Sequence, residues 1–456
     1  MTIKRVFVAN RGEIAVRIIR ACRELGIQTI QAYSAADKNM LAVQMADEAI
    51  CIGGDSAKES YLNTDAILNA AKMKAADALH PGYGFLSEDP DFAQACLDAG
   101  LIYVGPQPDV IRLMGNKSAA RELAQKAGVP VIPGSIGPVS DINQAKKIAQ
   151  QAQYPILVKA AAGGGGRGMR LVLDESGLEN ALQRASVEAQ AAFGSGEVYI
   201  EKYLPSIRHV EVQVFGDGKT VLHFGERDCT IQRRHQKLVE EAPSPVIDPK
   251  VRKSMFESAL ALCNTVAYRS AGTIEFVFDV SEQKYYFIEM NTRIQVEHTV
   301  SEMLTGLDLV KMQLMLADEQ PLKLTQSDIV FNGHVIECRI NAENPEKGFF
   351  PCPGTLEKFN PPLGPGVRVD THAYSGYELP PHYDSLIAKV LVHGRDRQEA
   401  LSRMKRALRE LEIDGVITTA QFHERLLNEP DFISGNYDTQ FVKMKMWAGH
   451  PSQHML

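Results

Sequence analysis

The stretch 272–298, GTIEFVFDVSEQKYYFIEMNTRIQVEH, decides the fold, because it reads as two strands joined by a short polar turn. Polar and apolar residues alternate along its first half, which is typical of a strand with one buried face. If the second strand pairs back around VSEQK, position 279 lies opposite 285 and Glu275 lies opposite Glu289. On that register one face of the second strand presents Tyr285, Phe287, Glu289 and Asn291.

Two carboxylates that face each other across a strand pair repel unless a cation lies between them. Glu275, Glu289 and the nearby Asn291 offer only oxygen ligands, which favours a hard ion, Mg²⁺ or Mn²⁺, completed by substrate phosphates. A solvated sheet face with spare acidic groups is the alternative interpretation. Past the hairpin, alternation places an arginine for an anion, an amide for orientation and a carboxylate for base chemistry on one side, at Arg293, Gln295 and Glu297.

Length and composition narrow the class of protein. A chain of 456 residues should form roughly two to four structural units, and 45% hydrophobic with 23% charged residues is ordinary for a globular protein. The net charge of −7 gives no basic footprint for nucleic acid. There is no long apolar run and no signal peptide, so we expect neither membrane insertion nor export. Seven cysteines without a CxxC pair indicate reduced thiols in a cytoplasmic protein and argue against a zinc site.

Residues 1–115 alternate short apolar strands with amphipathic helices, which predicts an α/β layer with a parallel sheet. Asn10 is expected to cap the first helix, with Glu13 completing a capping box. The turn ANRGEIA has a single glycine and lacks the dinucleotide fingerprint, so we predict no nucleotide there. The loop HPGYGFLSE, 80–88, is broken by glycines and includes Tyr83, and loops on rigid sheets often hold functional residues.

A glycine run in YPILVKAAAGGGGRGMRLV, 154–172, follows a strand that ends in Lys159. Glycines let backbone N–H groups approach a polyphosphate, and the lysine supplies charge. Because a strand rather than a helix follows, we predict a mobile flap and not a P-loop; a plain surface hairpin is the alternative. Lys117 lies at the entry of a helix predicted over 118–126, an unfavourable place for a cation unless an anion binds there.

The second half of the chain is expected to contain more strands. ERDCTIQRRHQK, 226–237, is rich in basic residues and forms either an anion site or a solvated face. A capping box at Thr299 and Glu302 predicts one helix from there to about Ala317. Residues 331–446 read as short strands separated by Pro/Gly turns, with helices over 397–411 and 416–427, which indicates a compact antiparallel or barrel-like unit.

Taken jointly, several long motifs closely resemble biotin carboxylase, an ATP-grasp enzyme, over about residues 3–446; they are ANRGEIA, HPGYGFLSE, KAAAGGGGRGMR, ERDCTIQRRHQK, FIEMNTRIQVEH, RINAE and PPHYDSLIAK. The resemblance implies a fold of α/β and α+β class. It implies an N-terminal parallel α/β (pre-ATP-grasp) domain over 1–115, an ATP-grasp domain over 116–330 with a glycine-rich lid at about 131–203, and a C-terminal β-barrel-like domain over 331–446.

The resemblance also implies a reaction and its residues. The family uses ATP and bicarbonate to carboxylate biotin on a biotin carboxyl carrier protein, through carboxyphosphate, giving carboxybiotin, ADP and phosphate. The implied metal ligands, for Mg²⁺ or Mn²⁺, are Glu275, Glu289 and Asn291. The implied catalytic residues are Lys237, Arg293, Glu297 and Arg339, with Glu297 as the base. The implied ATP-binding residues are Lys117, Lys159, Gly164, Gly165, Gly166, Glu201, Lys202, Tyr203, Leu204, His209, Gln232 and His235. Gln295 and Val296 match the bicarbonate pocket, and Tyr83 lies near biotin.

Partners follow from the same resemblance. The only Met-Lys-Met triplet, at 444–446, falls in a helix-like tail, so the carrier and the carboxyltransferase are expected on separate polypeptides, and this chain is expected to form a homodimer. We expect the first half-reaction of acetyl-CoA carboxylase, with pyruvate carboxylase or another acyl-CoA carboxylase as the alternative. Departures from the family pattern are Asn116, Thr371, His382 and Thr419, the last near the expected adenine pocket. Another ATP-grasp ligase and a silent nucleotide-binding regulator are the competing hypotheses.

Overall fold

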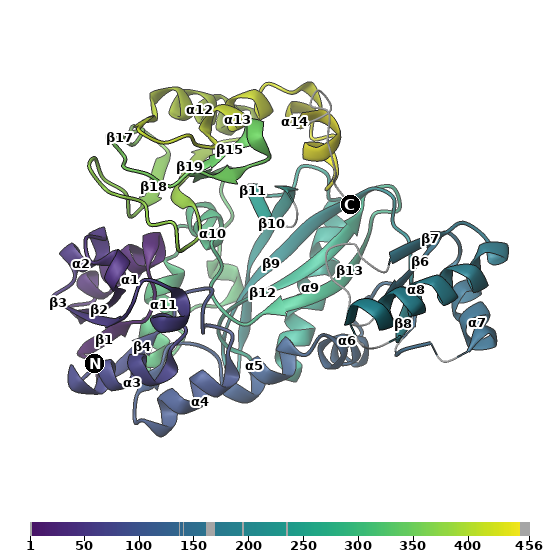
Figure 1. Cartoon of the computed structure of the whole chain (residues 1–456), viewed down its shortest axis with the longest axis horizontal. Helices are drawn as coiled ribbons and strands as arrows, with labels where there is room; N and C mark the ends of the chain where they lie inside the picture. Colours follow the sequence, from purple (N-terminus) through teal and green to yellow (C-terminus); the bar gives the residue numbers. More distant parts are fainter. Residues whose placement is uncertain are drawn as a thin grey trace.

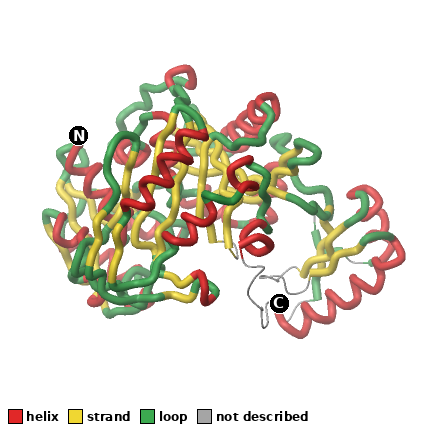
Figure 2. Tube along the Cα trace, turned by 90° about the horizontal axis from the view of Figure 1, so that it is seen from above, coloured by secondary structure: helices red, strands yellow, loops and turns green. Residues whose placement is uncertain are grey.

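The computed structural model describes residues 2–135, 137–139, 141–160, 169–193, 196–233 and 236–446. It contains a parallel sheet at the N-terminus, a long antiparallel sheet through the centre and a small sheet with two helices at one end (Figure 1; Figure 2). No helix of the described ranges is both long and apolar enough to cross a bilayer.

The N-terminal sheet has five parallel strands in the order β3-β2-β1-β4-β5, which confirms the predicted α/β layer. Its strands are β1 (Arg5–Val8), β2 (Gln28–Ser34), β3 (Glu48–Gly53), β4 (Ala78–His80) and β5 (Ile102–Tyr103). Successive side chains of a strand point to opposite faces. Val6 and Val8 therefore pack against helix α1, whereas Phe7 packs with residues of the helices on the other face. The helices are α1 (Gly12–Glu24), α2 (Leu41–Met45), α3 (Thr64–Met73), α4 (Pro90–Asp98) and α5 (Pro108–Gly115).

The predicted cap of α1 is wrong by one residue. Arg11, not Asn10, holds the N-cap position, and it makes no side-chain cap hydrogen bond. The Asn10 amide instead donates to the carbonyls of Pro81, at 2.6 Å, and Tyr83, at 2.8 Å. These two hydrogen bonds hold the 80–88 loop against the start of the helix. They fix the backbone position of Tyr83.

The central sheet has eight antiparallel strands in the order β13-β12-β9-β10-β11-β14-β19-β18. Its strands are β9 (Ile207–Asp217), β10 (Val221–Arg233), β11 (Gln236–Ala242), β12 (Arg269–Asp279), β13 (Lys284–Asn291), β14 (His334–Asn341), β18 (Val367–Thr371) and β19 (Leu386–Gly394). The C-terminal strands are antiparallel, as predicted, and they also continue this sheet. Helices α6 (Lys117–Lys126) and α9 (Pro249–Thr265) pack on its β9–β13 half through a shared apolar core.

The decisive hairpin forms, with one correction to its register. Glu275 pairs with Glu289 as predicted, but a β-bulge follows, so that Phe276 pairs with Phe287 and position 279 pairs with 284 rather than 285. The extra residue, Ile288, reverses the alternation between the two ends of β13. Tyr285 and Phe287, predicted on the acidic face, therefore lie in the apolar core beneath the sheet. The bulge lets one strand bury its aromatic residues and still turn its acids toward the opposite face.

The segment predicted as the lid contains a small sheet, β7-β6-β8, covered by two helices at one end of the molecule (Figure 1). Its elements are α7 (Ile142–Ala152), β6 (Ile156–Ala160), β7 (Met169–Val172), α8 (Leu178–Phe193) and β8 (Val198–Lys202). The antiparallel pairing of β6 with β7 agrees with a flap between two strands. The predicted phosphate glycines Gly164, Gly165 and Gly166 lie outside the described residues.

The helix predicted from Thr299 to Ala317 is two helices, α10 (His298–Thr305) and α11 (Leu309–Ala317). Gly306, with a left-handed φ of 71°, ends the first helix, and the Asp308 carboxylate caps the second by accepting from the Lys311 N–H at 2.8 Å. Thr299 does not cap: its hydroxyl donates to Glu337 of β14. Gly306 thus ends one helix and Asp308 begins the next. These two local signals decide the helix boundaries, although the apolar periodicity continues through them.

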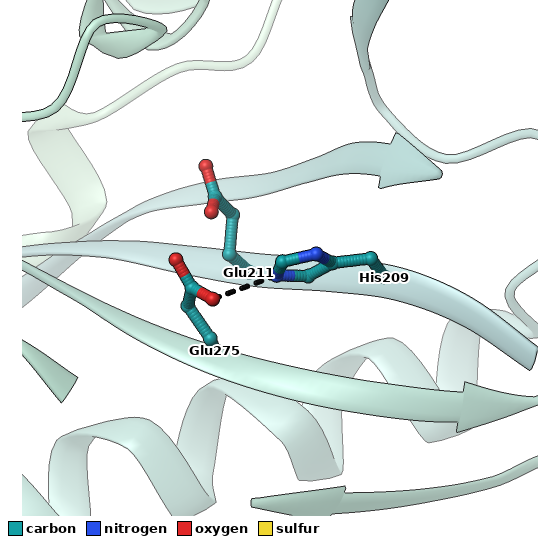
Figure 3. A group of neighbouring side chains, drawn as sticks. All are labelled: His209, Glu211 and Glu275. Carbon is teal, nitrogen blue, oxygen red and sulfur yellow. Dashed lines mark hydrogen bonds and ion pairs between the residues drawn. The ribbon is translucent and has the colours of Figure 1, made fainter. Parts of the chain in front are cut away.

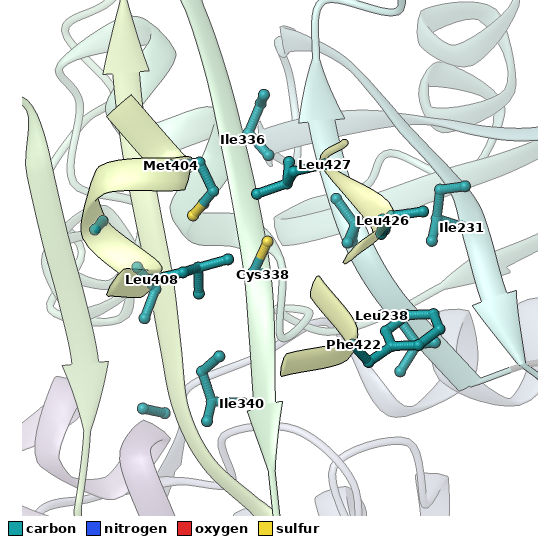
Figure 4. Packing of buried hydrophobic residues seen from close by; sticks show 14 of the residues in the cluster. Ile231, Leu238, Ile336, Cys338, Ile340, Met404, Leu408, Phe422, Leu426 and Leu427 are labelled. Atoms are coloured by element: carbon teal, nitrogen blue, oxygen red, sulfur yellow. The ribbon is translucent and has the colours of Figure 1, made fainter. Parts of the chain in front are cut away.

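The C-terminal part packs its own core over strands β14 and β19 (Figure 4). Cys338 and its neighbours on β14 meet Met404 of one helix and Leu426 of another. The remaining elements are β15 (Glu343–Asn344), β16 (Phe350–Pro351), β17 (Lys358–Asn360), α12 (Arg397–Glu410), β20 (Glu412–Asp414), α13 (Ala420–Leu426) and α14 (Pro430–Ser434). These helices cover one face of β14, and the side chains that alternate with Cys338 along the strand point to its other face.

Candidate functional site

Lys237 of β11 is the centre of a buried charge cluster on the central sheet. Its ammonium lies 2.6 Å from Glu211 of β9, 2.6 Å from Glu297 and 3.3 Å from Glu275 of β12. Burial alone would lower the pKa of Lys237, but the surrounding carboxylates raise it well above its usual value. The lysine is therefore charged at every physiological pH, and three strands and the start of α10 converge on it.

Glu297, the predicted base, is 2% exposed and lies between two cations. One of its oxygens contacts Lys237, and the other accepts from Arg339 of β14 at 2.8 Å. Burial would raise the pKa of Glu297, but Lys237 and Arg339 hold it well below its usual range. An anionic substrate that drew these two cations toward itself would free the carboxylate to accept a proton.

The predicted metal ligands are arranged as expected on paired strands. Glu275 and Glu289 are directly opposed in the register, and the Asn291 amide donates to Glu275 at 2.9 Å. Each carboxylate meets an ammonium, Glu275 that of Lys237 at 3.3 Å and Glu289 that of Lys117 at 3.1 Å. Two oxygen donors that already attract cations fit the donor set of a hard divalent ion. A Mg²⁺ or Mn²⁺ site at these residues stays a prediction.

A nearby group of possible ligands was not predicted as a set (Figure 3). His209, Glu211 and Glu275 place their ligand atoms within 4.8 Å of one another, and the His209 ring contacts Glu275 at 2.8 Å. Glu211 is already paired with Arg227 and Lys237. This pairing makes Glu211 a support for the two cations rather than a free ligand.

The predicted ATP-binding residues fall in three places. Lys159 of β6 forms an ion pair with Glu201 of β8, which Arg121 also contacts at 3.1 Å. Lys117 begins α6 beside Glu289. Lys202, Tyr203 and Leu204 form the end of β8 and the segment after it, and Gln232 pairs with Lys237 across β10 and β11. His235 lies outside the described residues. Lid and sheet therefore each contribute cations that could contact a polyphosphate.

A cavity of about 520 Å³ joins several other predicted residues. Tyr83, Arg293, Val296 and Arg339 all line it, together with residues of the N-terminal and C-terminal parts of the chain. Arg293 is held by Glu88, which accepts from its Nε at 2.8 Å, and by the side-chain Oδ1 of Asn291, which accepts from its Nη2 at 2.8 Å. Predicted bicarbonate residues, Arg293 and Val296, thus line one cavity with the predicted biotin residues, Tyr83 and Arg339.

Two buried partners of the site, Glu211 and Glu240, were missed from the sequence. Glu211 supports Arg227 and Lys237, and Glu240 of β11 accepts from Arg339 at 2.7 Å. A signal for Glu211 was present, because it follows His209 by two residues in a strictly alternating strand and so shares its face. Glu240 follows no such pattern, since its role depends on the pairing of β11 with β14, two strands far apart in sequence.

The four residues predicted to depart from the family pattern make the following local contacts. The Asn116 carboxamide caps α6 by accepting from Ala119 at 3.0 Å. Thr419, expected near an adenine pocket, is fully buried, and its hydroxyl donates to the carbonyl of Arg339 at 2.8 Å. The Thr371 hydroxyl donates to a backbone carbonyl, and His382 lines the cavity. None of the four displaces a predicted catalytic side chain.

Glu337 is a buried acid on the same face of β14 as Arg339. It lies opposite Glu240 in the pairing of β14 with β11. Its carboxyl accepts a hydrogen bond from the Thr299 hydroxyl and forms no ion pair within the described residues. Burial and the like charge of Glu240 raise the pKa of Glu337 to about 8, with Lys389 opposing. Glu240 has Arg339 as its counter-ion, so Glu337 is the member of the pair that holds a proton at neutral pH.

Replacing this acid by its neutral isostere, E337Q, should change how stability depends on pH. The folded protein keeps a proton on Glu337 where the unfolded chain has released it, so wild-type stability falls as pH rises from about 4.5 to about 8. Urea unfolding should show E337Q equal to wild type near pH 4 and more stable by at least about 1.4 kcal/mol near pH 9, one pKa unit of linkage. Equal stability at both pH values would show that Glu337 ionises freely.

The fold and this site define a class of protein, the ATP-dependent ligases. Three family models match the chain: "Biotin carboxylase, N-terminal domain" over residues 2–111, "Carbamoyl-phosphate synthase L chain, ATP binding domain" over 116–325, and "Biotin carboxylase C-terminal domain" over 337–444. Biotin carboxylase 1 of Bacillus subtilis is 53% identical over 443 residues, which are 97% of this chain and 98% of that protein. The chain belongs to the biotin carboxylase family.

Other relatives belong to different assemblies. A pyruvate carboxylase subunit of Methanothermobacter thermautotrophicus is 50% identical over 96% of this chain and 89% of its own length. A crystal structure of the biotin carboxylase domain dimer of Hydrogenobacter thermophilus 2-oxoglutarate carboxylase, with MgADP, ADP and bicarbonate, is 46% identical with a TM-score of 0.88, covering 99% of this chain and 100% of that one. Relatives of similar identity thus serve different carboxyl acceptors, so the family alone does not define the acceptor of this chain.

Proposed function

We propose that this chain carboxylates biotin on a separate carrier protein through carboxyphosphate, in a site where Glu297 is the base. The observation that supports this role most strongly is the Glu297 carboxylate, buried and held between Lys237 and Arg339 next to a cavity. Bicarbonate entering from the cavity would exchange with Glu297 as the partner of these cations. Its proton would pass to the Glu297 oxygen, and Arg293 would hold the resulting anion.

The chain's cations then stabilise charge as it develops. Lys117 and Lys159 would contact the ATP phosphates from the sheet and the lid, and Lys237 would lie beside the transferring phosphoryl group. Glu275, Glu289 and Asn291 would hold one or two Mg²⁺ or Mn²⁺ ions, which neutralise phosphate charge when bound. Arg339 would steady the ureido oxygen of biotin, because its guanidinium is fixed by Glu240 and reaches the cavity wall.

We further propose the organisation of the complete enzyme. The chain divides into domains over 1–115, 116–330 and 331–446, forms a homodimer, and supplies carboxybiotin to a separate carboxyltransferase, as the first half-reaction of cytoplasmic acetyl-CoA carboxylase. The Bacillus subtilis biotin carboxylase, 98% of which this chain covers, supports a separate biotin carboxylase chain, and the dimeric domain from Hydrogenobacter thermophilus supports a homodimer. The pyruvate and 2-oxoglutarate carboxylase relatives support another acceptor as the alternative.

The experiment that tests the reaction measures ADP formation by the purified chain. We expect turnover that requires Mg²⁺ or Mn²⁺ and bicarbonate together, rises with free biotin, and stops when EDTA removes the metal. An acceptor screen with amino acids and other carboxylates is the control for a different ATP-dependent ligase. ATP binding without bicarbonate-dependent ADP formation would contradict the proposal and favour a regulatory nucleotide-binding protein.

A further inference from the structure

A buried ion pair at the wall of the cavity has no part in the reaction described so far. Lys389 of β19 is fully buried, and its ammonium lies 3.1 Å from Glu13 of α1 and donates to the carbonyl of Val296 at 2.6 Å. A buried ion pair is poor evidence for stability, because desolvation costs about as much as the attraction returns. Its position beside the cavity invites a functional explanation.

The third member of this cluster is Tyr83, which lines the same cavity as Glu13 and Val296. The Tyr83 hydroxyl lies 2.5 Å from the Glu13 oxygen that also faces Lys389. The backbone of Tyr83 is fixed independently, because Asn10 donates to its carbonyl. The hydroxyl is thus placed by the loop, while its rotation about the C–O bond is set by Glu13.

The direction of that hydrogen bond follows from the charges. Burial alone would lower the pKa of Lys389, but Glu13 raises it above its usual value, so the ammonium keeps its charge. Glu13, paired with this ammonium, accepts the hydrogen bond of the Tyr83 hydroxyl, and burial with the adjacent Glu13 raises the pKa of Tyr83 well above its usual value. The phenol therefore stays protonated, and its O–H donates a hydrogen bond to Glu13. What remains on the Tyr83 oxygen is a pair of acceptor sites at the cavity wall.

We propose that Glu13 and Lys389 are positioning residues that make the Tyr83 hydroxyl a hydrogen-bond acceptor for an N–H of the biotin ureido ring. The inference rests on the proposed function, which brings that ring to Arg339 in the same cavity. Arg339 offers donors to the ureido oxygen, and Tyr83 offers an acceptor to a ring N–H. The two residues would thus bind different atoms of the same ureido group. A neutral pair in place of Glu13 and Lys389 would leave the hydroxyl free to turn its proton toward the ring.

The test is a kinetic double-mutant cycle on the intact chain with free biotin, MgATP and bicarbonate. E13Q/K389M removes both charges together and should raise the KM for biotin about five- to tenfold, the value of one hydrogen bond, with the KM for ATP within about twofold of wild type. Y83F should raise the biotin KM by a similar factor. Because the pair acts through the tyrosine, Y83F/E13Q/K389M should match Y83F within about twofold. An unchanged biotin KM in folded E13Q/K389M, or additive effects in the triple variant, would overturn the proposal.

A second measurement does not depend on how the double variant folds. A biotin methylated on its non-reacting ring nitrogen should compete for wild type at least about fivefold more weakly than biotin does, and equally with biotin for Y83F, which lacks the acceptor. The same preference in both proteins would overturn the proposal. Wild type without biotin-dependent ADP formation would instead refute the proposed function, so the two failures are distinguishable.

Discussion

Replacing Glu297 by glutamine should reduce bicarbonate-dependent ADP formation by about 10²- to 10⁴-fold, the range expected when a general base is lost. The substitution keeps the shape of the side chain and its contacts with Lys237 and Arg339, which are 2.6 and 2.8 Å away, but removes the group that accepts the proton. ATP binding, measured by nucleotide titration, should stay within a few-fold of wild type, because the predicted phosphate contacts come from Lys117 and Lys159.

The matched control is E122Q, the same change on the exposed face of α6, where Glu122 forms a surface ion pair with Lys126. Surface ion pairs contribute little, so this variant should turn over ATP as wild type does. A fall of less than about tenfold in E297Q would contradict Glu297 as the base. Loss of ATP binding together with turnover would instead indicate that the glutamate is needed to keep the cluster folded.

Features set by local sequence patterns were predicted better than features set by the pairing of distant strands. Alternation in 272–298 was enough to oppose Glu275 and Glu289, because one residue of register decides which face a side chain takes. The same alternation misplaced Tyr285 and Phe287, because a bulge at Ile288 leaves no mark in the hydrophobic pattern. Periodicity also joined α10 and α11 into one helix, where Gly306 and Asp308 were the better signal.

The candidate site shows the same division. The family motifs supplied Lys237, Glu297 and Arg339, and the structure brings the three side chains into contact. Their supports, Glu211 and Glu240, lie on strands that meet only through the order of the eight-stranded sheet. A motif specifies residues that touch substrate, whereas the counter-charges that hold them depend on the three-dimensional pairing of strands.

Arg227 is the buried support whose loss should cost the most stability. It is fully buried in β10, and its guanidinium donates to Glu211 at 2.7 Å, Gln213 at 2.6 Å and Gln295 at 2.8 Å. R227M would leave these acceptors without their donor and leave Glu211 with Lys237 as its remaining cation. Removing one partner of a buried pair costs about 3–5 kcal/mol, so urea unfolding followed by circular dichroism should show a loss of that size.

Two further variants separate charge from packing in this prediction. R112M removes an arginine that is 52% exposed, and should change stability by less than about 0.5 kcal/mol. E211Q/R227M removes the carboxylate that R227M leaves under-compensated, and should recover part of the lost stability. A loss below about 1 kcal/mol in R227M would show that water or Lys237 replaces the guanidinium. The double variant E211Q/R227M lacks the Glu211 charge that Arg227 balances. If it is as unstable as R227M, the loss of stability comes from packing and not from charge.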